Sequence, residues 1–260
     1  MLNPRVSAPS LPQDACMLIR GHNLHVEIHG AQDAPPMILL HHGLGSVRAW
    51  KSNIPDLAAA GFRVIAYDRW GYGKSDARPS LGQPYFADDL ADLEQLMNQL
   101  EIDQAALIGH SDGGTIALYF AAANPQRVTR LVVVAAHIYI EPKMQPGMQM
   151  ILHTFESDPD FQKKFFRQHG EKAASVFKNW YDGWYKVEHL AWDMRPTLSQ
   201  ITCCTLVVQG EQDEHASPQH ARDIAAAIRG ARLWLLPGAG HMLPQDCAEV
   251  FNRKVIDFLR

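Results

Sequence analysis

The stretch Gly109-His110-Ser111-Asp112-Gly113 decides how this chain folds. Residues 105–108 before it are apolar and predict a buried strand, and residues 115–123 after it predict a helix. A serine set between two glycines at a strand-to-helix turn is typical of a nucleophile elbow, which exposes the serine hydroxyl. The glycines permit a tight turn because no Cβ lies beside it. We therefore expect Ser111 to be a nucleophile; the alternative is a surface turn that happens to contain serine.

The composition indicates one globular domain without a strong electrostatic signature. The chain has 260 residues, a net charge of −4 and a pI near 6.3, so we expect no nucleic-acid or membrane partner. Its four cysteines suggest no disulfide framework and no zinc site. Residues 1–13 lack the apolar stretch of about 7–15 residues found in signal peptides, and no run approaches roughly 18 apolar residues. We expect a cytoplasmic monomer or homodimer.

Apolar runs alternate with helical patterns along the chain. Residues 17–20 and 24–29 predict an opening antiparallel hairpin around Gly21. Buried strands are expected at 37–41, 63–67, 105–108, 128–136, 205–209 and 233–236, and helices at 48–60, 86–100, 115–123, 218–228 and 248–259. Strands that alternate with helices at this spacing predict an α/β fold with a mostly parallel, eight-stranded sheet and helices on both faces.

One segment interrupts the alternation. Residues 137–198 show no strand pattern and contain helical stretches near 145–156, 161–169 and 172–187. We predict a helical cap at 137–198, a core domain made of 16–136 and 199–260, and an N-terminal extension at 1–15. The cap carries an apolar ridge that either packs on the core or walls a substrate pocket; its residues are Phe177, Trp180, Tyr181, Trp184 and Tyr185.

A serine hydroxyl needs a base and an acid that holds the base. The order expected after an elbow is serine, acid, histidine. His241 lies in a loop just after the last expected strand, at the same sheet edge as Ser111, and is our choice of base among thirteen histidines. Asp213 follows the strand 205–209 and is our choice of acid, with Glu211 and Glu214 expected to be solvated loop charges.

His215 and His220 are expected to be surface residues, because they precede a helix. An oxyanion would need two backbone N–H donors, for which we choose Leu44, in the loop after strand 37–41, and Asp112, after the nucleophile. The side chain of Asp112 has two interpretations: it bonds nearby structure, or it borders the pocket and pairs with a substrate ammonium. Substrate-binding candidates are Asp112, His42, Trp180, Trp184 and Met242.

We expect no cofactor and no metal. His41 and His42 are adjacent on a strand and therefore point to opposite faces, and no third ligand stands at a useful spacing.

Three sets of residues together resemble the α/β-hydrolase fold family. They are the elbow with Asp213 and His241, the run His42-Gly43-Leu44-Gly45, and residues 68–75, Asp-Arg-Trp-Gly-Tyr-Gly-Lys-Ser. Within that family the chain is similar to the biphenyl-hydrolase-like and valacyclovir-hydrolase-like group, through residues 111–114, 177–183 and 205–213. The resemblance implies a carboxylic-ester hydrolase, with amino-acid esters as one class. His110 departs from this group, which often has Trp there.

The sequence thus predicts a serine hydrolase of carboxylesterase type (EC 3.1.1) that acts on a small-molecule ester. The central position of Ser111, with Asp112 one step later, favours acyl transfer over an alkyl-enzyme ester. Alternatives on the same residues are hydrolysis of a carbon–carbon bond in a ring-fission product, or of a lactone. A ligand receptor without turnover and a cofactor-free perhydrolase are further alternatives, because one scaffold can host many functions.

Overall fold

The computed structural model describes residues 14–81, 86–185 and 191–260. Its centre is an eight-stranded sheet in the order β1-β2-β4-β3-β5-β6-β7-β8. The strands are β1 (Asp14–Ile19), β2 (His22–His29), β3 (Pro36–Leu40), β4 (Arg63–Tyr67), β5 (Ala105–His110), β6 (Val128–Val134), β7 (Cys204–Gly210) and β8 (Arg232–Leu236).

The pairing confirms the predicted mostly parallel sheet. β1 pairs with β2, and β2 with β4, in antiparallel register, whereas β3 to β8 all run parallel. The central strands β4 and β5 are buried at every position because helices cover both faces. Parallel strands place their carboxyl ends at one edge, so the loops after β3, β5, β7 and β8 meet there.

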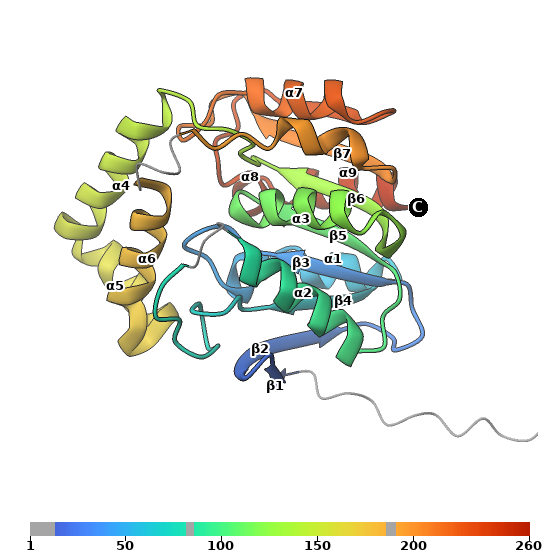
Figure 1. Ribbon diagram of the computed structural model, residues 1–260, viewed down its shortest axis with the longest axis horizontal. Coiled ribbons are helices and arrows are strands. Elements are labelled where there is room, and N and C mark those ends of the chain that lie inside the picture. Colours follow the sequence, from blue (N-terminus) through green and yellow to red (C-terminus); the bar gives the residue numbers. More distant parts are fainter. Residues whose placement is uncertain (1–13, 82–85, 186–190) are drawn as a thin grey trace, which may run out of the picture.

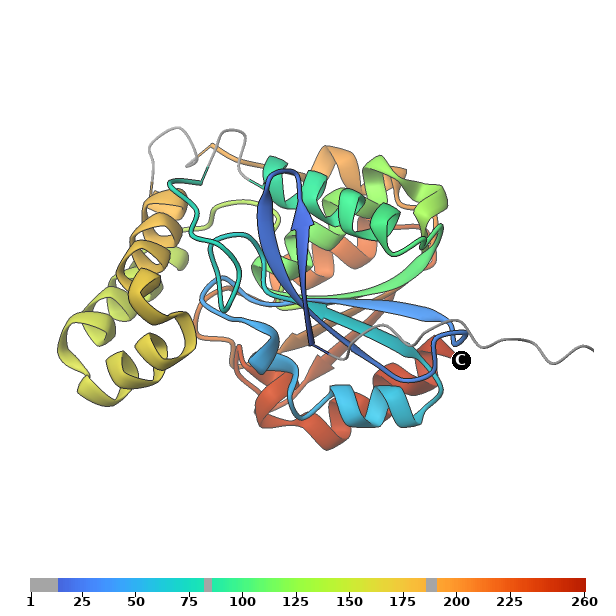
Figure 2. The same ribbon diagram turned by 90° about the horizontal axis from the view of Figure 1, so that it is seen from below.

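Figure 2 shows the two helical layers on either side of the sheet. One layer contains α2 (Ala87–Gln99), α3 (Asp112–Ala123) and α7 (Gln219–Ala227); the other contains α1 (Ile54–Ala59) and α9 (Ala248–Leu259). Each layer packs its own apolar cluster against the sheet. The short helix α8 (Leu243–Asp246) was not predicted.

Three further helices stand apart from the two layers. They are α4 (Met144–Ser157), α5 (Pro159–His169) and α6 (Ala173–Tyr185), and Figure 1 shows them together beyond the end of the sheet. They fall within the segment 137–198 that we expect to be a cap, and start and end close to the helical stretches predicted for it; residues 186 and 187 of the third stretch lie outside the described residues.

The predicted helix 48–60 is two shorter elements. A 3-10 helix η1 (Val47–Trp50) is followed by α1, which begins only at Ile54. Pro55 stands in the first turn of α1, where its missing N–H costs nothing, whereas a continuous helix would place it in the interior. Asn53 stabilises the break, because its Nδ2 donates to Asn252 Oδ1 and to the carbonyl of Pro244.

The first strand begins earlier than predicted, and two other features of the chain can be compared with the sequence analysis. Asp14 and Ala15 already belong to β1, although we placed them in the N-terminal extension; residues 1–13 lie outside the described part. The four cysteines are free. In the described ranges no helix has the length and apolar character needed to cross a membrane.

Candidate active site

Ser111 stands between β5 and α3 in a strained backbone conformation. Its φ of 55° and ψ of −120° are unusual for a residue with a Cβ. Its N–H donates to the carbonyl of Val134 at 2.8 Å, and its own carbonyl accepts from Thr115 N–H at 3.0 Å. These bonds anchor the turn to β6 and to the first turn of α3, and so hold the serine at the carboxyl edge of the sheet.

Two glycines make this turn sterically possible. A Cβ on Gly109 would lie 2.2 Å from the carbonyl oxygen of Gly113, and a Cβ on Gly113 would lie 2.2 Å from the carbonyl oxygen of Leu40. Both distances are far inside van der Waals contact. The close approach of the elbow to its own helix and to β3 therefore requires glycine at both positions, as the sequence pattern indicated.

Asp213 and His241 are joined by a hydrogen bond of 2.8 Å between Oδ2 and Nδ1. The carboxylate is buried, and it also accepts from Gln209 Nε2 and from the N–H groups of His215 and Ala216. Burial alone would raise the pKa of Asp213, but the charge and hydrogen bond of His241 and the backbone N–H groups hold that pKa well below its usual range. Asp213 is therefore a permanent anion beside the imidazole.

The bond to Asp213 decides which nitrogen of His241 is free. Since a carboxylate accepts, Nδ1 carries the proton and Nε2 is left as the basic nitrogen. Ser111 and His241 line the same pocket. No hydrogen bond joins their side chains within the described part of the chain; such contacts often tighten only when substrate is bound.

The loop between β3 and η1 carries the predicted oxyanion donor Leu44. Its carbonyl accepts from Gln168 Nε2 at 3.1 Å and from His169 Nε2 at 3.2 Å, so α5 is attached to this loop. A Cβ on Gly43 would lie 2.0 Å from Trp180 Nε1 and 2.9 Å from Asp112 Oδ2. The loop is thus pressed between α6 and the start of α3, with Gly43, Leu44 and Asp112 all lining the pocket.

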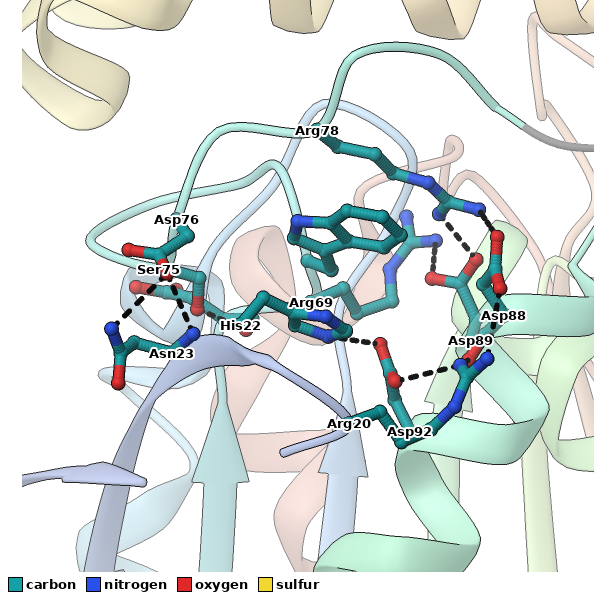
Figure 3. Close-up of polar contacts among 12 residues, drawn as sticks. Arg20, His22, Asn23, Arg69, Ser75, Asp76, Arg78, Asp88, Asp89 and Asp92 are labelled. Carbon is teal, nitrogen blue, oxygen red and sulfur yellow. Dashed lines mark hydrogen bonds and ion pairs between the residues drawn. The ribbon is translucent and has the colours of Figure 1, made fainter. Parts of the chain in front are cut away.

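Asp112 lines the pocket and is also the end of a buried chain of charges. Arg69 lies 3.6 Å from its Oδ2 and bonds Asp89 at 3.0 Å; Asp89 in turn bonds Arg78 at 2.9 Å. Figure 3 shows this chain continuing through Asp88, Arg20 and Asp92 to His22. Burial raises the pKa of Asp112 to about 6, although Arg69 and a hydrogen bond from Trp184 oppose the shift.

The pocket has a volume of about 540 Å³ and lies between the loops of the core and helices α4, α5 and α6. Its wall includes all the substrate-binding candidates, namely His42, Asp112, Trp180, Trp184 and Met242. Trp180 and Trp184 are each 7% exposed and also belong to the large apolar cluster of the core. They therefore both pack α6 on the core and face the pocket, which combines the two interpretations of the aromatic ridge. The side chain of Tyr185 lies outside what the structure describes.

A family model described as the alpha/beta hydrolase fold matches residues 35–191. The chain belongs to the α/β-hydrolase fold family. Sequence relatives agree with this assignment. The chain is 29% identical to 2-hydroxy-6-oxo-6-phenylhexa-2,4-dienoate hydrolase of Burkholderia cepacia, covering 91% of this chain and 92% of the relative. It is 30% identical to serine hydrolase BPHL of Mus musculus, covering 95% and 86%.

A solved structure of the same fold is the enol-lactonase from Burkholderia xenovorans LB400. The TM-score is 0.77 at 25% identity, and the match covers 94% of this chain and 99% of that one. The chain is therefore a hydrolase of the α/β-hydrolase family, and its relatives carry names that point to more than one kind of bond.

Two histidines of this α/β-hydrolase do not lie at the surface as predicted. His220 was expected at the surface but is fully buried: its Nδ1 accepts from Ile138 N–H at 3.2 Å, and its ring stacks on Tyr139. His215 was also expected at the surface, yet it lines the pocket with its ring 4.6 Å from that of His241. The loop after β7 is covered by the segment that enters the cap, a contact with no local sequence signal. Glu214 is partly exposed, as expected, but accepts from His241 N–H.

His137 is a pocket residue for which no role was predicted. It is 5% exposed, lines the pocket, and its ring stacks on that of His241 at 5.8 Å. Neither of its ring nitrogens has a hydrogen-bond partner in the described residues. Burial holds the pKa of His137 well below its usual range, so the ring is neutral and offers one donor and one acceptor.

His41 and His42 do not form a metal pair. His41 Nε2 accepts from Arg69 N–H at 3.0 Å, so its Nδ1 donates to the carbonyl of His42 at 2.8 Å. His41 thus ties the two loops after β3 and β4 together, while His42 lines the pocket. The described residues contain no group of three or more potential metal ligands.

Proposed function

We propose that this α/β-hydrolase is a serine hydrolase that cleaves small carboxylic esters through an acyl-enzyme. The observation that carries the proposal is the 2.8 Å bond from His241 to the buried carboxylate of Asp213, with His241 and Ser111 on the wall of one pocket. Ser111 Oγ attacks the acyl carbon while His241 Nε2 takes its proton. His241 then gives that proton to the departing alcohol, and water releases the acyl group by the same steps.

The oxyanion of the tetrahedral intermediate would be held by the N–H groups of Leu44 and Asp112. Asp112 begins α3, where backbone N–H groups point out of the helix and favour negative charge. Loss of one such donor typically costs about 2.7–4 kcal/mol of transition-state stabilisation. No cofactor takes part in these steps.

The side chain of Asp112 supports a preference for esters with an ammonium group near the carbonyl. It lines the pocket one residue from the nucleophile. A charge-assisted hydrogen bond to it would be worth about 1.5–3 kcal/mol. Amino-acid esters are therefore the first class of substrate to examine.

A second candidate is hydrolysis of a carbon–carbon bond in a vinylogous diketone on the same residues. The name of the Burkholderia cepacia relative favours it, because that protein is a 2-hydroxy-6-oxo-6-phenylhexa-2,4-dienoate hydrolase. The lactonase named above supports ring esters as a third group of substrates.

The deciding experiment compares wild type with Ser111→Ala on a library of 4-nitrophenyl esters, lactones and the phenylhexadienoate. We expect ester hydrolysis with a burst of acyl-enzyme, lost by about 10³-fold or more in Ser111→Ala with unchanged folding. If 2-hydroxy-6-oxo-6-phenylhexa-2,4-dienoate were turned over faster than the esters, hydrolysis of a carbon–carbon bond would be favoured. Binding of esters without any burst would indicate a ligand receptor. Halide oxidation with acetate and peroxide would indicate a perhydrolase.

A further inference from the structure

Four cations line the pocket, two from the core and two from the helices beyond the sheet. Arg48 and Lys51 come from η1 and the residue that ends it, and Lys164 and Arg167 come from α5 of the cap. All four are exposed. Asp112, which is buried, is the one carboxylate among the described residues of the pocket wall. Because the four cations are exposed and Asp112 is buried, the solvent-facing part of the pocket wall is positive.

These cations have no carboxylate partner in the described part of the chain. Other exposed cations do: Lys178 pairs with Asp182 and Arg253 with Glu249, each four residues along its helix. Positive charge near the end of a helix is favourable in itself, which accounts for Arg167 in the last turn of α5. The helix dipole does not account for Lys164 in the middle of α5, or for Arg48 and Lys51 in and next to η1.

The helical spacing of α5 turns one cationic face to the pocket. Lys164 and Phe165 each lie three or four residues from both Phe161 and Gln168, so the four side chains share one face of the helix, and all four line the pocket. Lys163 is also exposed but does not line it. The face is held in place, because His169 at the end of α5 accepts from Gly73 N–H through Nδ1 and donates to the carbonyl of Leu44 through Nε2.

We infer that the mouth of the pocket binds a carboxylate at the end of the substrate that lies away from the reacting carbonyl. The inference rests on the proposed hydrolysis of esters and specifies their class. A carboxylate between η1 and α5 would meet cations from both sides, whereas the same charge beside the reacting carbonyl would meet Asp112. The pocket thus favours an anion at the far end of the molecule and disfavours one near the scissile bond.

The test uses 4-nitrophenyl half-esters of dicarboxylic acids of increasing length, each compared with its neutral carboxamide analogue. For wild type we expect the kcat/KM ratio of acid to amide to be below one for short chains and above one for long chains. Lys164→Glu/Arg167→Glu should lower the long-chain ratio about threefold to tenfold, and Lys163→Glu should leave it unchanged. The long-chain preference should also weaken at high salt.

Two results would overturn the inference: a long-chain ratio no higher than the short-chain ratio, or a ratio that the double reversal and Lys163→Glu change equally. Loss of the proposed function gives a different pattern, in which wild type cleaves neither the acids nor the amides. Calorimetric binding of the long dicarboxylate to wild type then decides the matter, because the double reversal should weaken it and Lys163→Glu should not. Equal binding by all three proteins would overturn the inference in that case as well.

Discussion

His110 Nε2 donates a hydrogen bond of 2.9 Å to the carbonyl oxygen of His241, so the residue before the proposed nucleophile holds the backbone of the proposed base. His110 is fully buried, and burial lowers its pKa to about 3. The ring is therefore neutral at any working pH, and the bond does not vary with pH. This contact connects the end of β5, next to Ser111, to the loop that carries His241, and so fixes the two proposed catalytic residues relative to one another.

We predict that His110→Phe lowers both activity and stability. The carbonyl of His241 would be left buried without this donor, which costs about 1–3 kcal/mol. We expect kcat to fall by roughly tenfold, because small displacements of a catalytic group are costly. Thermal unfolding and ester hydrolysis measure the two effects. His153→Phe, at an exposed position of α4, is the control; equal losses in both variants would contradict the prediction.

Asp213→Asn should be far more damaging than Glu214→Gln. Both oxygens of Asp213 accept two hydrogen bonds, so an amide would turn its NH₂ group toward donors in either orientation. We expect a loss of about 10⁴-fold in kcat for Asp213→Asn, as in related triads. Glu214 accepts from the N–H of His241 and lies 3.6 Å from His215 Nε2, but its side chain is exposed, so its change should cost little. The reverse order in steady-state kinetics would reassign the acid.

Asp112 should make substrate preference depend on pH. Its pKa is raised from 3.8 to about 6, so the carboxyl is neutral below about pH 6 and charged above it. The preference for an amino-acid ester over its uncharged isostere should therefore grow between pH 5 and 7.5 in wild type. Asp112→Asn keeps the backbone N–H and should show a small, constant preference. Equal kcat/KM ratios in the two proteins across this range would exclude contact with the ammonium.

The raised pKa of Asp112 also makes the stability of the protein depend on pH. Between about pH 4 and 6 the folded protein keeps a proton on Asp112 that the unfolded chain has lost, so this residue makes folding less favourable as pH rises. The melting temperature of Asp112→Asn minus that of wild type should therefore increase from pH 4 to 7. A difference that stays constant would mean that the carboxyl titrates normally.

Asp89 should contribute much more to the free energy of unfolding than its neighbour Asp88. Asp89 lies between the guanidinium groups of Arg69 and Arg78, and all three side chains are buried (Figure 3). Asp89→Asn would remove the carboxylate that the two buried guanidinium groups share, at a cost of about 3–5 kcal/mol. Asp88 is partly exposed, and Asp88→Asn should cost about 0.2–1 kcal/mol. Urea unfolding measures both, and similar midpoints would contradict the prediction.

The fold could be predicted in detail because its signals are local. Parallel strands covered on both faces are apolar throughout, and β4 and α9 begin and end at the predicted residues. Ser111, Asp213 and His241 could be proposed together for the same reason: each follows the carboxyl end of a strand. The predicted continuous helix 48–60 is wrong because Pro55 is favourable only in the first turn of a helix, so α1 begins at Ile54.

The surroundings of the site could not be predicted, because they depend on contacts between distant segments. His215 and His220 have the neighbours of surface residues in the sequence, but Ile138 and Tyr139 contact His220, and His215 lies against His241 on the pocket wall. The ion pair of Arg69 with Asp112 joins the loop after β4 to the start of α3. Nothing in either segment indicates that the other is near, so the raised pKa of Asp112 was also unforeseen.

The two hydrogen bonds of His169 make the cap and the Leu44 loop a single mechanical unit. Lifting α5 from the core would break its bonds to Gly73 and to the carbonyl of Leu44. If the cap were raised, the Leu44 loop would lose the contacts that position it. The N–H of Leu44 is the group proposed to hold the oxyanion. A narrow substrate that enters between η1 and α5 would leave the hydrogen bonds of His169 in place. A bulky substrate that requires the cap to move would bind to a site in which these hydrogen bonds are broken. Under the proposed mechanism, the width of a substrate should therefore affect its turnover as much as its charge does.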